Sequence, residues 1–380
     1  MNVLFLEPWY GGSHRRFADG LSAHSRHDVR CVTMAARSWK WRMQGGAVTL
    51  AEKAREATEA WAPDLIVATD MVNLPAFLAL TRDRFARVPV LLYLHENQLT
   101  YPLREDAAGQ TPARDLTYAF VNILSMMAAD RVVFNSRYHH DEFFGALPDL
   151  LRRFPDYTHV GHLPGLLAKS SVLHLGVDLA VLDAARPAAE ARRVREPGPP
   201  VVLWNHRWEY DKDPEAFFRV VNRLDDAGAR FRLILAGETF AETPPAFADG
   251  FRRYADRVLH YGYAESLGDY ASLLWRSDIV VSTSRHEFFG LSMLEAIHCG
   301  CHPLLPDRLT YPELVPESLH RPLLHAPVLY DDEADLFATL RRLLDGSDLP
   351  LPAEVLRRIP APLAWPVHAP RFDALFDEMA

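Results

Sequence analysis

Short apolar runs, each followed by a polar turn, recur along the whole chain. Examples lie within residues 64–70, 88–94 and 279–281 and are rich in valine, isoleucine and leucine. Runs of this length between turns are typical of strands buried in a parallel sheet. Two later segments, 118–127 and 291–298, place their apolar residues at helical spacing. The alternation of the two patterns predicts an α/β protein with open parallel sheets.

The length of the chain predicts more than one domain. A typical domain contains about 100–200 residues, and this chain has 380. Residues 183–200 are rich in Ala and Arg and end in Pro-Gly-Pro-Pro, which is the composition of a linker. We therefore expect an N-terminal domain over residues 1–182 and a second domain over residues 201–355.

Composition narrows the class of protein. With 49% hydrophobic and 24% charged residues, the sequence is typical of a soluble globular protein. No apolar run reaches the roughly 18 residues that span a bilayer, and residues 1–7 lack the features of a signal peptide. Three cysteines fit a reducing compartment, so we expect a cytoplasmic protein. The net charge of -9 argues mildly against a large RNA-binding surface, so RNA contact would need a local patch.

Residues 277–300 form the most informative stretch, with the pattern of a strand, a turn and a helix that stops at Gly300. Two carboxylates, Glu287 and Glu295, flank a turn that precedes the helix. Backbone N–H groups at a helix N-terminus suit phosphate or sugar oxygens, and here they belong to Phe289, Gly290 and Leu291. The segment therefore predicts a site for a polar, anionic ligand. The spacing alone is also compatible with an ordinary βα unit that carries two surface glutamates.

Polar residues also follow the predicted strands of the first half. Gly11 and Gly12 come after the opening strand at residues 2–6, before a helix expected from about Arg15. Ligands of open α/β sheets gather at the carboxyl ends of strands. Further candidates at such positions are Ser13, His14, Asp70, His95, Asn97 and Gln98.

Residues 37–43 alternate cations with large aromatics and are the best candidate for a nucleic-acid contact. Aromatic faces stack on unpaired bases, and Arg or Lys holds phosphates. The residues concerned are Trp39, Lys40, Trp41 and Arg42. The alternative is a loop whose tryptophans pack on the domain while its cations are solvated.

The Glu287-x7-Glu295 segment, with Phe289-Gly290-Leu291 inside it, resembles the E-x7-E signature of retaining glycosyltransferases of the GT-B fold. Those families often have Gly or Pro where this chain has Phe288. The resemblance implies two Rossmann-like domains facing a central cleft, with residues 356–380 as a helix that crosses back to the first domain. It also implies four catalytic residues, which are His95, Arg207, Lys212 and Glu287.

In this family an Arg and a Lys grip the donor diphosphate, which Arg207 can chelate in bidentate fashion while Lys212 adds a point charge. The resemblance also places Glu295 on the ribose hydroxyls. The other donor-binding residues would be Gly11, Gly12, Tyr263, Phe289, Gly290 and Leu291. Asp211-x-Asp213 could be read as a metal-binding DxD, but the two cations can do the metal's electrostatic work. We therefore expect metal-independent transfer.

Four segments together resemble the tRNA-queuosine α-mannosyltransferases: residues 7–14, 39–42, 95–102 and 286–290. That subfamily shares the His-Glu-Phe-Phe-Gly form. The resemblance implies transfer of mannose from GDP-mannose to queuosine in the anticodon of tRNA for aspartate. The acceptor-binding residues would be Ser13, His14, Trp39, Lys40, Trp41, Arg42, Asp70, Asn97 and Gln98, with Arg15, Arg16 and Arg37 beside them.

Two other classes of function remain open. The same fold could glycosylate a lipid or a small molecule, in which case residues 37–43 would be a membrane-surface or packing feature. A non-enzymatic nucleotide-sugar or RNA-binding module is disfavoured, because both the Arg207 and Lys212 pair and the two glutamates are present.

Overall fold

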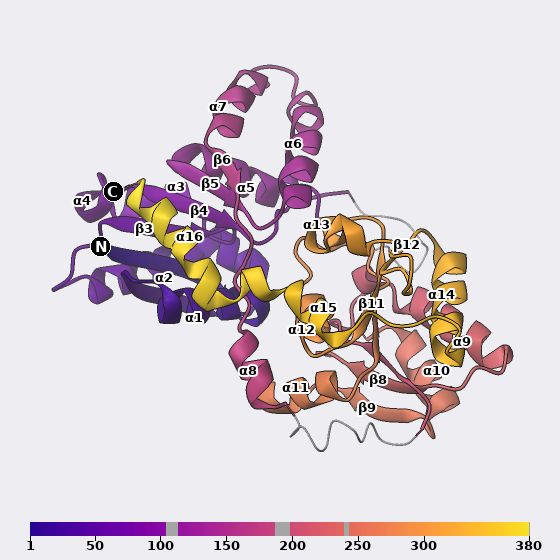
Figure 1. Cartoon of the computed structure of the whole chain (residues 1–380). Helices are drawn as coiled ribbons and strands as arrows, with labels where there is room; N and C mark the ends of the chain where they lie inside the picture. The colour runs from indigo at the N-terminus through magenta and orange to yellow at the C-terminus, as the bar shows by residue number, and fades with distance from the viewer. Residues whose placement is uncertain (104–112, 187–197, 239–242, 380) are drawn as a thin grey trace. The chain divides into compact units, whose positions relative to one another are not determined.

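The computed structural model describes residues 1–103, 113–186, 198–238 and 243–379 (Figure 1). The chain divides into two compact units, the first formed by Met1–Gly176 with Trp365–Ala380 and the second by Val177–Ala364. The boundary falls at Gly176, whereas the sequence analysis placed it at residue 182. Most of the predicted linker lies outside the described residues. Within the described residues, no helix combines the length and the apolar character needed to cross a membrane.

The first unit contains a six-stranded sheet in the order β2-β1-β3-β4-β5-β6, whose paired strands are parallel. The strands are β1 (Asn2–Tyr10), β2 (Asp28–Ala35), β3 (Leu65–Thr69), β4 (Val90–Leu94), β5 (Arg131–Phe134) and β6 (Ser170–Val172). Burial of β3 and β4 along their whole length explains their uninterrupted apolar sequence.

The helices of this unit are α1 (Gly12–His24), α2 (Trp39–Ala57), α3 (Leu74–Leu80), α4 (Arg82–Phe85), α5 (Leu116–Ala128), α6 (Arg137–Leu151), α7 (Leu163–Ala168) and α16 (Trp365–Asp377), with a 3-10 turn at Val160–His162. Side-chain caps begin three of them: Asn73 accepts from Ala76 N, Asp115 from Thr117 N and Ser136 from His139 N.

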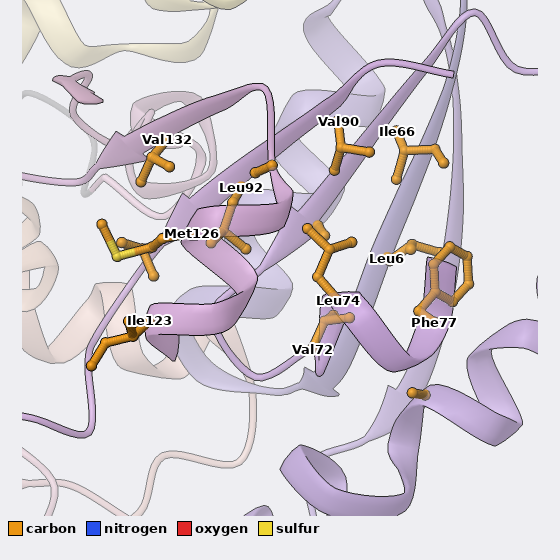
Figure 2. Close-up of a cluster of buried hydrophobic side chains, with 14 of the residues drawn as sticks. Leu6, Ile66, Val72, Leu74, Phe77, Val90, Leu92, Ile123, Met126 and Val132 are labelled. Atoms are coloured by element: carbon orange, nitrogen blue, oxygen red, sulfur yellow. The ribbon is translucent and has the colours of Figure 1, made fainter. Parts of the chain in front are cut away.

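The core of the first unit lies between the sheet and its covering helices. Figure 2 shows Leu92 of β4 and Val132 of β5 near Ile123 and Met126 of α5. Each such side chain is at most 3% exposed, and full burial of one contributes about 1.5–3 kcal/mol. This packing fixes the sheet whose carboxyl edge carries the polar residues of interest.

The C-terminal helix α16 packs within the first unit, beside α1 (Figure 1). Trp365 at its start is 1% exposed and lies against Gly20, where an added Cβ would come within 2.0 Å of the indole Nε1. Asp373 accepts hydrogen bonds from Ser25 Oγ (2.6 Å) and Arg26 N (3.2 Å). The tail is therefore anchored by both apolar and polar contacts.

The second unit contains another six-stranded sheet, in the order β12-β11-β10-β7-β8-β9, again with parallel pairing. Its strands are β7 (Val201–Trp204), β8 (Arg232–Ala236), β9 (Val258–Gly262), β10 (Ile279–Val281), β11 (His302–Pro306) and β12 (Leu329–Tyr330). Its helices are α8 (Leu179–Ala184), α9 (Pro214–Asp226), α10 (Pro245–Tyr254), α11 (Leu267–Trp275), α12 (Leu291–His298), α13 (Tyr311–Leu314), α14 (Glu333–Asp345) and α15 (Ala353–Arg358), with 3-10 turns at Tyr210–Lys212, Glu317–Leu319 and Ala361–Leu363.

Three local predictions about the first unit need correction. Strand β1 does not end at Leu6 but continues to Tyr10, with a register irregularity after Glu7 where Pro8 lacks a donor. Helix α1 begins at Gly12 rather than at about Arg15. The aromatic and basic stretch is not a loop, because α2 begins at Trp39. Two of its apolar side chains, Trp39 and Met43, pack on the first unit.

Candidate functional site

The turn between β10 and α12 has the geometry of an anion-binding helix start. Gly290 has a φ of +83°, which favours glycine, and it precedes the first helical residue, Leu291. Its carbonyl accepts from Met293 N and Leu294 N. Phe289 N donates to Glu287 Oε1 at 3.3 Å, while the N–H groups of Leu291 and Ser292, the first two residues of the helix, have no acceptor within it. The turn therefore presents backbone donors beside a carboxylate, and their contact with a ligand stays a prediction.

Lys212 is bound to this turn. Its Nζ donates to the carbonyl of His286 (2.7 Å) and lies 3.3 Å from Glu287 Oε2 and 3.1 Å from Asp211 Oδ2. Burial raises the pKa of Glu287, but Lys212 and His206 outweigh it and lower that pKa to about 2. Glu287 is therefore ionised at neutral pH, and Lys212 compensates its charge.

Arg207 follows β7 in the same unit and is more open to solvent. Its guanidinium lies 3.2 Å from Glu209 Oε2, and its side chain is 46% exposed. Asp213, half of the alternative DxD pair, accepts from Ala216 N as the cap of α9 and from Arg285 Nε at 2.6 Å. Asp213 thus serves the local fold, and Asp211 pairs with Lys212.

Glu295 sits on α12, buried at 4% exposure. Tyr270 Oη donates to Glu295 Oε2 at 3.0 Å, and Asn205 Nδ2 lies 3.0 Å from both Tyr270 Oη and the Ser292 carbonyl. Sequence reasoning missed Asn205 and Tyr270. Asn205 could have been noticed because it follows β7, two residues before Arg207.

Tyr263 is placed apart from this group. It follows the edge strand β9, which β7 and β8 separate from β10. Its side chain is 65% exposed. A stacking contact with a nucleotide base stays a prediction for this residue.

The polar residues of the first unit meet at the carboxyl edge of its sheet. Thr69 of β3 pairs with Tyr93 of β4, so Asp70 and His95 leave the sheet side by side. Asp70 Oδ1 accepts from His95 N at 2.8 Å, and Asn135 Nδ2 donates to the His95 carbonyl at 2.8 Å. Burial raises the pKa of Asp70 to about 7, although His14 opposes the shift.

His14 belongs to the same group, and its partner Glu7 was missed by sequence reasoning. Glu7, within β1, is fully buried, and its Oε2 lies 3.0 Å from His14 Nδ1. Burial lowers the pKa of His14, but Glu7 and nearby acids outweigh it and raise that pKa to about 9. The His14 and His95 rings lie 4.1 Å apart between centroids. The only sequence signal for Glu7 was its place after the first strand.

The loop after β4 uses its own amide side chains to hold its shape. Asn97 Oδ1 accepts from Leu99 N (2.9 Å) and Thr100 N (2.8 Å), which is an Asx turn. Gln98 Nε2 donates to Glu96 Oε1 at 2.9 Å. The predicted acceptor role of Asn97 and Gln98 therefore stays a prediction, beside this internal one.

The glycines after β1 differ from each other. An added Cβ at Gly11 would lie 2.6 Å from the Cβ of Ala36, so close packing explains this glycine. At Gly12 the φ is +52° and no atom lies within 4 Å of an added Cβ. Ser13 beside it is exposed. Gly12 and Ser13 are open to a ligand in a way that Gly11 is not.

The aromatic and basic stretch divides into packed and exposed members. Trp39 packs edge-on against Tyr118 with ring centroids 4.9 Å apart, and Arg42 donates twice to the Ala35 carbonyl at 3.1 Å. Trp41 is 60% exposed and Lys40 is also exposed. The packing alternative therefore holds for Trp39. The Lys40 ammonium lies over the Trp39 and Tyr118 rings, 5.7 and 5.9 Å from their centroids, and a nucleic-acid contact of Trp41 and Lys40 stays a prediction.

Comparison with known proteins adds a family to this geometry. Residues 2–177 match the family described as tRNA-queuosine alpha-mannosyltransferase N-terminal, and residues 186–347 match glycosyl transferases group 1. A tRNA-queuosine alpha-mannosyltransferase of Drosophila melanogaster is 31% identical over 83% of this chain and 82% of its own length. The chain belongs to the tRNA-queuosine alpha-mannosyltransferase family. The resemblance inferred from four short segments is thereby confirmed, and the protein is a glycosyltransferase.

This family member also resembles proteins with other names. A GDP-mannose-dependent alpha-(1-6)-phosphatidylinositol dimannoside mannosyltransferase of Mycobacterium tuberculosis is 24% identical over 79% of this chain and 78% of its own length. Among solved structures, the sucrose-phosphate synthase of Thermosynechococcus elongatus has a TM-score of 0.71 at 16% identity and covers 100% of this chain and 98% of its own. The HepE protein of Anabaena, solved with UDP, has a TM-score of 0.67 at 16% identity, covering 100% and 99%. The predicted fold class, GT-B with two Rossmann-like domains, is confirmed.

Each unit of this mannosyltransferase family member contains its own group of candidate site residues. The second unit gathers Lys212 and Glu287 in direct contact, and Arg207 follows strand β7, which pairs with β10. The first unit gathers His14, Asp70 and His95 around Glu7. The roles of these residues in substrate binding are proposals, argued below.

Proposed function

We propose that this protein transfers mannose from GDP-mannose to queuosine in the anticodon of tRNA for aspartate, with retention of configuration. The proposed acceptor rests on the 31% identity to a named tRNA-queuosine alpha-mannosyltransferase over most of both chains. The match of residues 2–177 to the N-terminal region of that family supports it, since this unit is the one expected to bind the acceptor.

The donor site is proposed to lie in the second unit. Arg207 and the N–H groups of the α12 start would hold the diphosphate, and Glu295 would accept hydrogen bonds from the ribose hydroxyls. A relative named as GDP-mannose-dependent supports guanosine as the nucleoside. Because Arg207 and Lys212 supply positive charge there, we propose that transfer needs no metal ion.

The chemical step exchanges one bond for another on the same face of the sugar. The bond between the anomeric carbon and the diphosphate oxygen breaks while a bond from the acceptor hydroxyl oxygen to that carbon forms. The proton of the acceptor hydroxyl passes to the leaving phosphate, so no protein nucleophile is required. The protein then contributes positioning and charge stabilisation.

The exposed part of the aromatic and basic stretch is the proposed contact with the anticodon loop. Trp41 can stack on an unpaired base, and Lys40 can hold a phosphate. A local patch of this kind is compatible with the net charge of -9. We also place the reaction in the cytoplasm, in keeping with three cysteines that are all in the thiol form, outside any disulfide.

The test is to incubate the purified protein with GDP-mannose and tRNA that does or does not contain queuosine. The RNA is then digested, and the masses of the nucleosides are measured by mass spectrometry. A hexose added only to queuosine is the expected result. A tRNA from the same source without queuosine is the matched control, and UDP-glucose in place of GDP-mannose tests the donor. No added mass on tRNA known to contain queuosine would contradict the proposed acceptor.

A lipid acceptor is the second candidate, favoured by the relative named for a phosphatidylinositol dimannoside. In that case GDP-mannose would label a lipid extract in the same assay, and added tRNA would not compete. Labelled lipid together with unlabelled tRNA would replace the first proposal with this one.

A further inference from the structure

A buried group of three side chains lies at the carboxyl edge of the first unit's sheet, and no residue role assigned above explains its arrangement. Glu7 comes from the second half of β1, His14 from the first turn of α1, and His95 directly follows β4. Their exposures are 0%, 5% and 6%. One polar atom of each lies within 4.8 Å of the others.

Glu7 and His14 form an ion pair inside this group. The carboxylate has two partners, because Oε1 accepts from Trp9 N at 2.8 Å and Oε2 lies 3.0 Å from His14 Nδ1. Glu7 is therefore held in place by the backbone, and it in turn fixes the plane of the His14 ring. A protonated imidazole is the form that a buried carboxylate at this distance stabilises.

His95 is in the opposite situation. Neither of its ring nitrogens has a hydrogen-bond partner among the described residues, although both are buried. Its ring faces His14 at 4.1 Å and 30°, while Phe17 and Tyr93 contact it edge-on at 5.0 Å. Burial and the adjacent His14 charge lower the pKa of His95 well below its usual value. A neutral imidazole with one unused donor and one unused acceptor results.

A buried donor or acceptor without a partner destabilises the folded state, so two such nitrogens on one ring indicate a binding position for a polar ligand. A sugar hydroxyl both donates and accepts a hydrogen bond and therefore matches a neutral imidazole. A carboxylate or phosphate would match only the donor. The chemistry of His95 thus favours a polyhydroxylated ligand.

The same three side chains have the composition of a metal site, one carboxylate and two imidazoles. The geometry does not favour it. Metal ligation requires the in-plane lone pairs of both rings to converge on one point, whereas the His14 and His95 rings are stacked with a tilt of 30° and 4.1 Å between their centroids. In addition, Glu7 Oε2 and His14 Nδ1 are already engaged with each other at 3.0 Å.

We propose that Glu7 and His14 are positioning residues, whose ion pair holds the His95 imidazole by stacking so that both of its ring nitrogens meet hydroxyl groups of the substrate. This inference rests on the proposed sugar transfer. It replaces the acceptor contact predicted for His14 with an action through His95.

The kinetic test compares His14→Gln, His95→Gln and the double variant, using GDP-mannose and queuosine-containing tRNA. Each single variant should lower kcat about 10- to 100-fold, the usual loss when a supporting partner is removed, with KM for tRNA within about twofold. The double variant should be no slower than His95→Gln, because His14 acts through His95. His162→Gln, at an exposed histidine of the same unit, is the matched control and should be unchanged.

Two kinetic outcomes would overturn the proposal. Losses that multiply in the double variant would mean that His14 and His95 act separately. A rise in KM for tRNA in His14→Gln, with kcat retained, would mean that His14 itself binds the acceptor, as the sequence analysis predicted. Thermal melting of each variant identifies loss of folding. If a histidine variant does not fold, the more conservative Glu7→Gln is compared with the wild type in the same kinetic assay.

A second measurement does not depend on the reaction. Nuclear magnetic resonance of 15N-labelled histidine side chains at pH 7.5 should contain a cationic signal that is absent in His14→Gln and, among the signals of the other histidines, a neutral signal that is absent in His95→Gln. The charged and titratable groups that face the pair are Glu7, Asp70, Glu96 and His139. In Glu7→Gln the cationic signal should titrate at a lower pH.

A neutral His14 at pH 7.5, or a His95 signal that His14→Gln leaves unmoved, would refute the positioning role. A stoichiometric metal ion in the purified protein that is lost in all three single variants would do the same. If instead every variant and the wild type are inactive on queuosine while the resonances behave as expected, the proposed acceptor fails and the ion pair stands.

Discussion

Lys212 Nζ lies 3.3 Å from Glu287 Oε2, and the two side chains are 7% and 20% exposed. This contact joins the two motifs that dominate the second unit, although they stand 75 positions apart in the chain. Lys212 therefore compensates a protein carboxylate before any diphosphate arrives. A donor phosphate would meet a turn whose charges are already organised.

Lys212→Met should lower the free energy of unfolding at pH 7 by about 3–5 kcal/mol, because the buried Asp211 and the partly buried Glu287 would both lose their cation. In the wild type the pKa of Glu287 is about 2 against 4.5 unfolded, so its stabilisation is present above pH 4.5 and is lost as pH falls through 2. Urea unfolding between pH 2 and 7 measures the free energy of unfolding of the variant and the wild type. The difference between the two free energies should become smaller toward pH 2. Lys53→Met, at an exposed lysine, is the control, and equal stabilities of Lys212→Met and wild type at pH 7 would disprove the pairing.

Glu295→Ala should raise the dissociation constant for GDP-mannose about 10- to 100-fold, the loss expected when a charged hydrogen-bond partner is removed. Isothermal calorimetry measures it directly. Tyr270→Phe should have a smaller effect, since it removes the hydroxyl that orients Glu295 at 3.0 Å. Glu354→Ala, at an exposed glutamate of the same unit, should bind like the wild type. Unchanged donor affinity in Glu295→Ala would show that the ribose role is wrong.

Trp41→Ala should raise KM for tRNA about tenfold or more while leaving the melting temperature unchanged, because an exposed indole can stack on a base. Trp39→Ala should mainly lower the melting temperature, since Trp39 packs against Tyr118. Steady-state kinetics and thermal melting of both variants test the pair. If Trp41→Ala keeps its KM for tRNA, the anticodon platform is not on this helix.

Gly20→Ala should destabilise the protein by about 1–3 kcal/mol, because the added methyl would overlap the indole of Trp365 at the start of α16. Gly145→Ala is the matched control within a helix of the same unit. Nothing lies within 4 Å of its added Cβ, so it should be neutral or stabilising by up to about 1 kcal/mol. Thermal or urea unfolding compares them, and two equal stabilities would contradict the docking of α16 on α1.

Much of the fold was predictable because its signals are local. The buried strands β3, β4 and β10 and the helix α12 follow from apolar runs and helical spacing within a few residues. The end of β1 was misjudged because Pro8 and the polar Glu7 interrupt the apolar run while the backbone stays extended. The start of α2 was missed because its first turn is rich in aromatic and basic residues that carry no helical stripe.

By itself, the sequence determined the two α/β domains, the family, and the contiguous motif from Glu287 to Glu295, since these depend on spacing along the chain. Only the tertiary structure decided which charged side chains pair with each other. Glu7 meets His14 and faces His95 because β1, β3 and β4 are neighbours in the sheet. Lys212 meets Glu287 because β7 pairs with β10. The order of strands in a sheet is set by the packing of the whole domain, and no local pattern of residues specifies it.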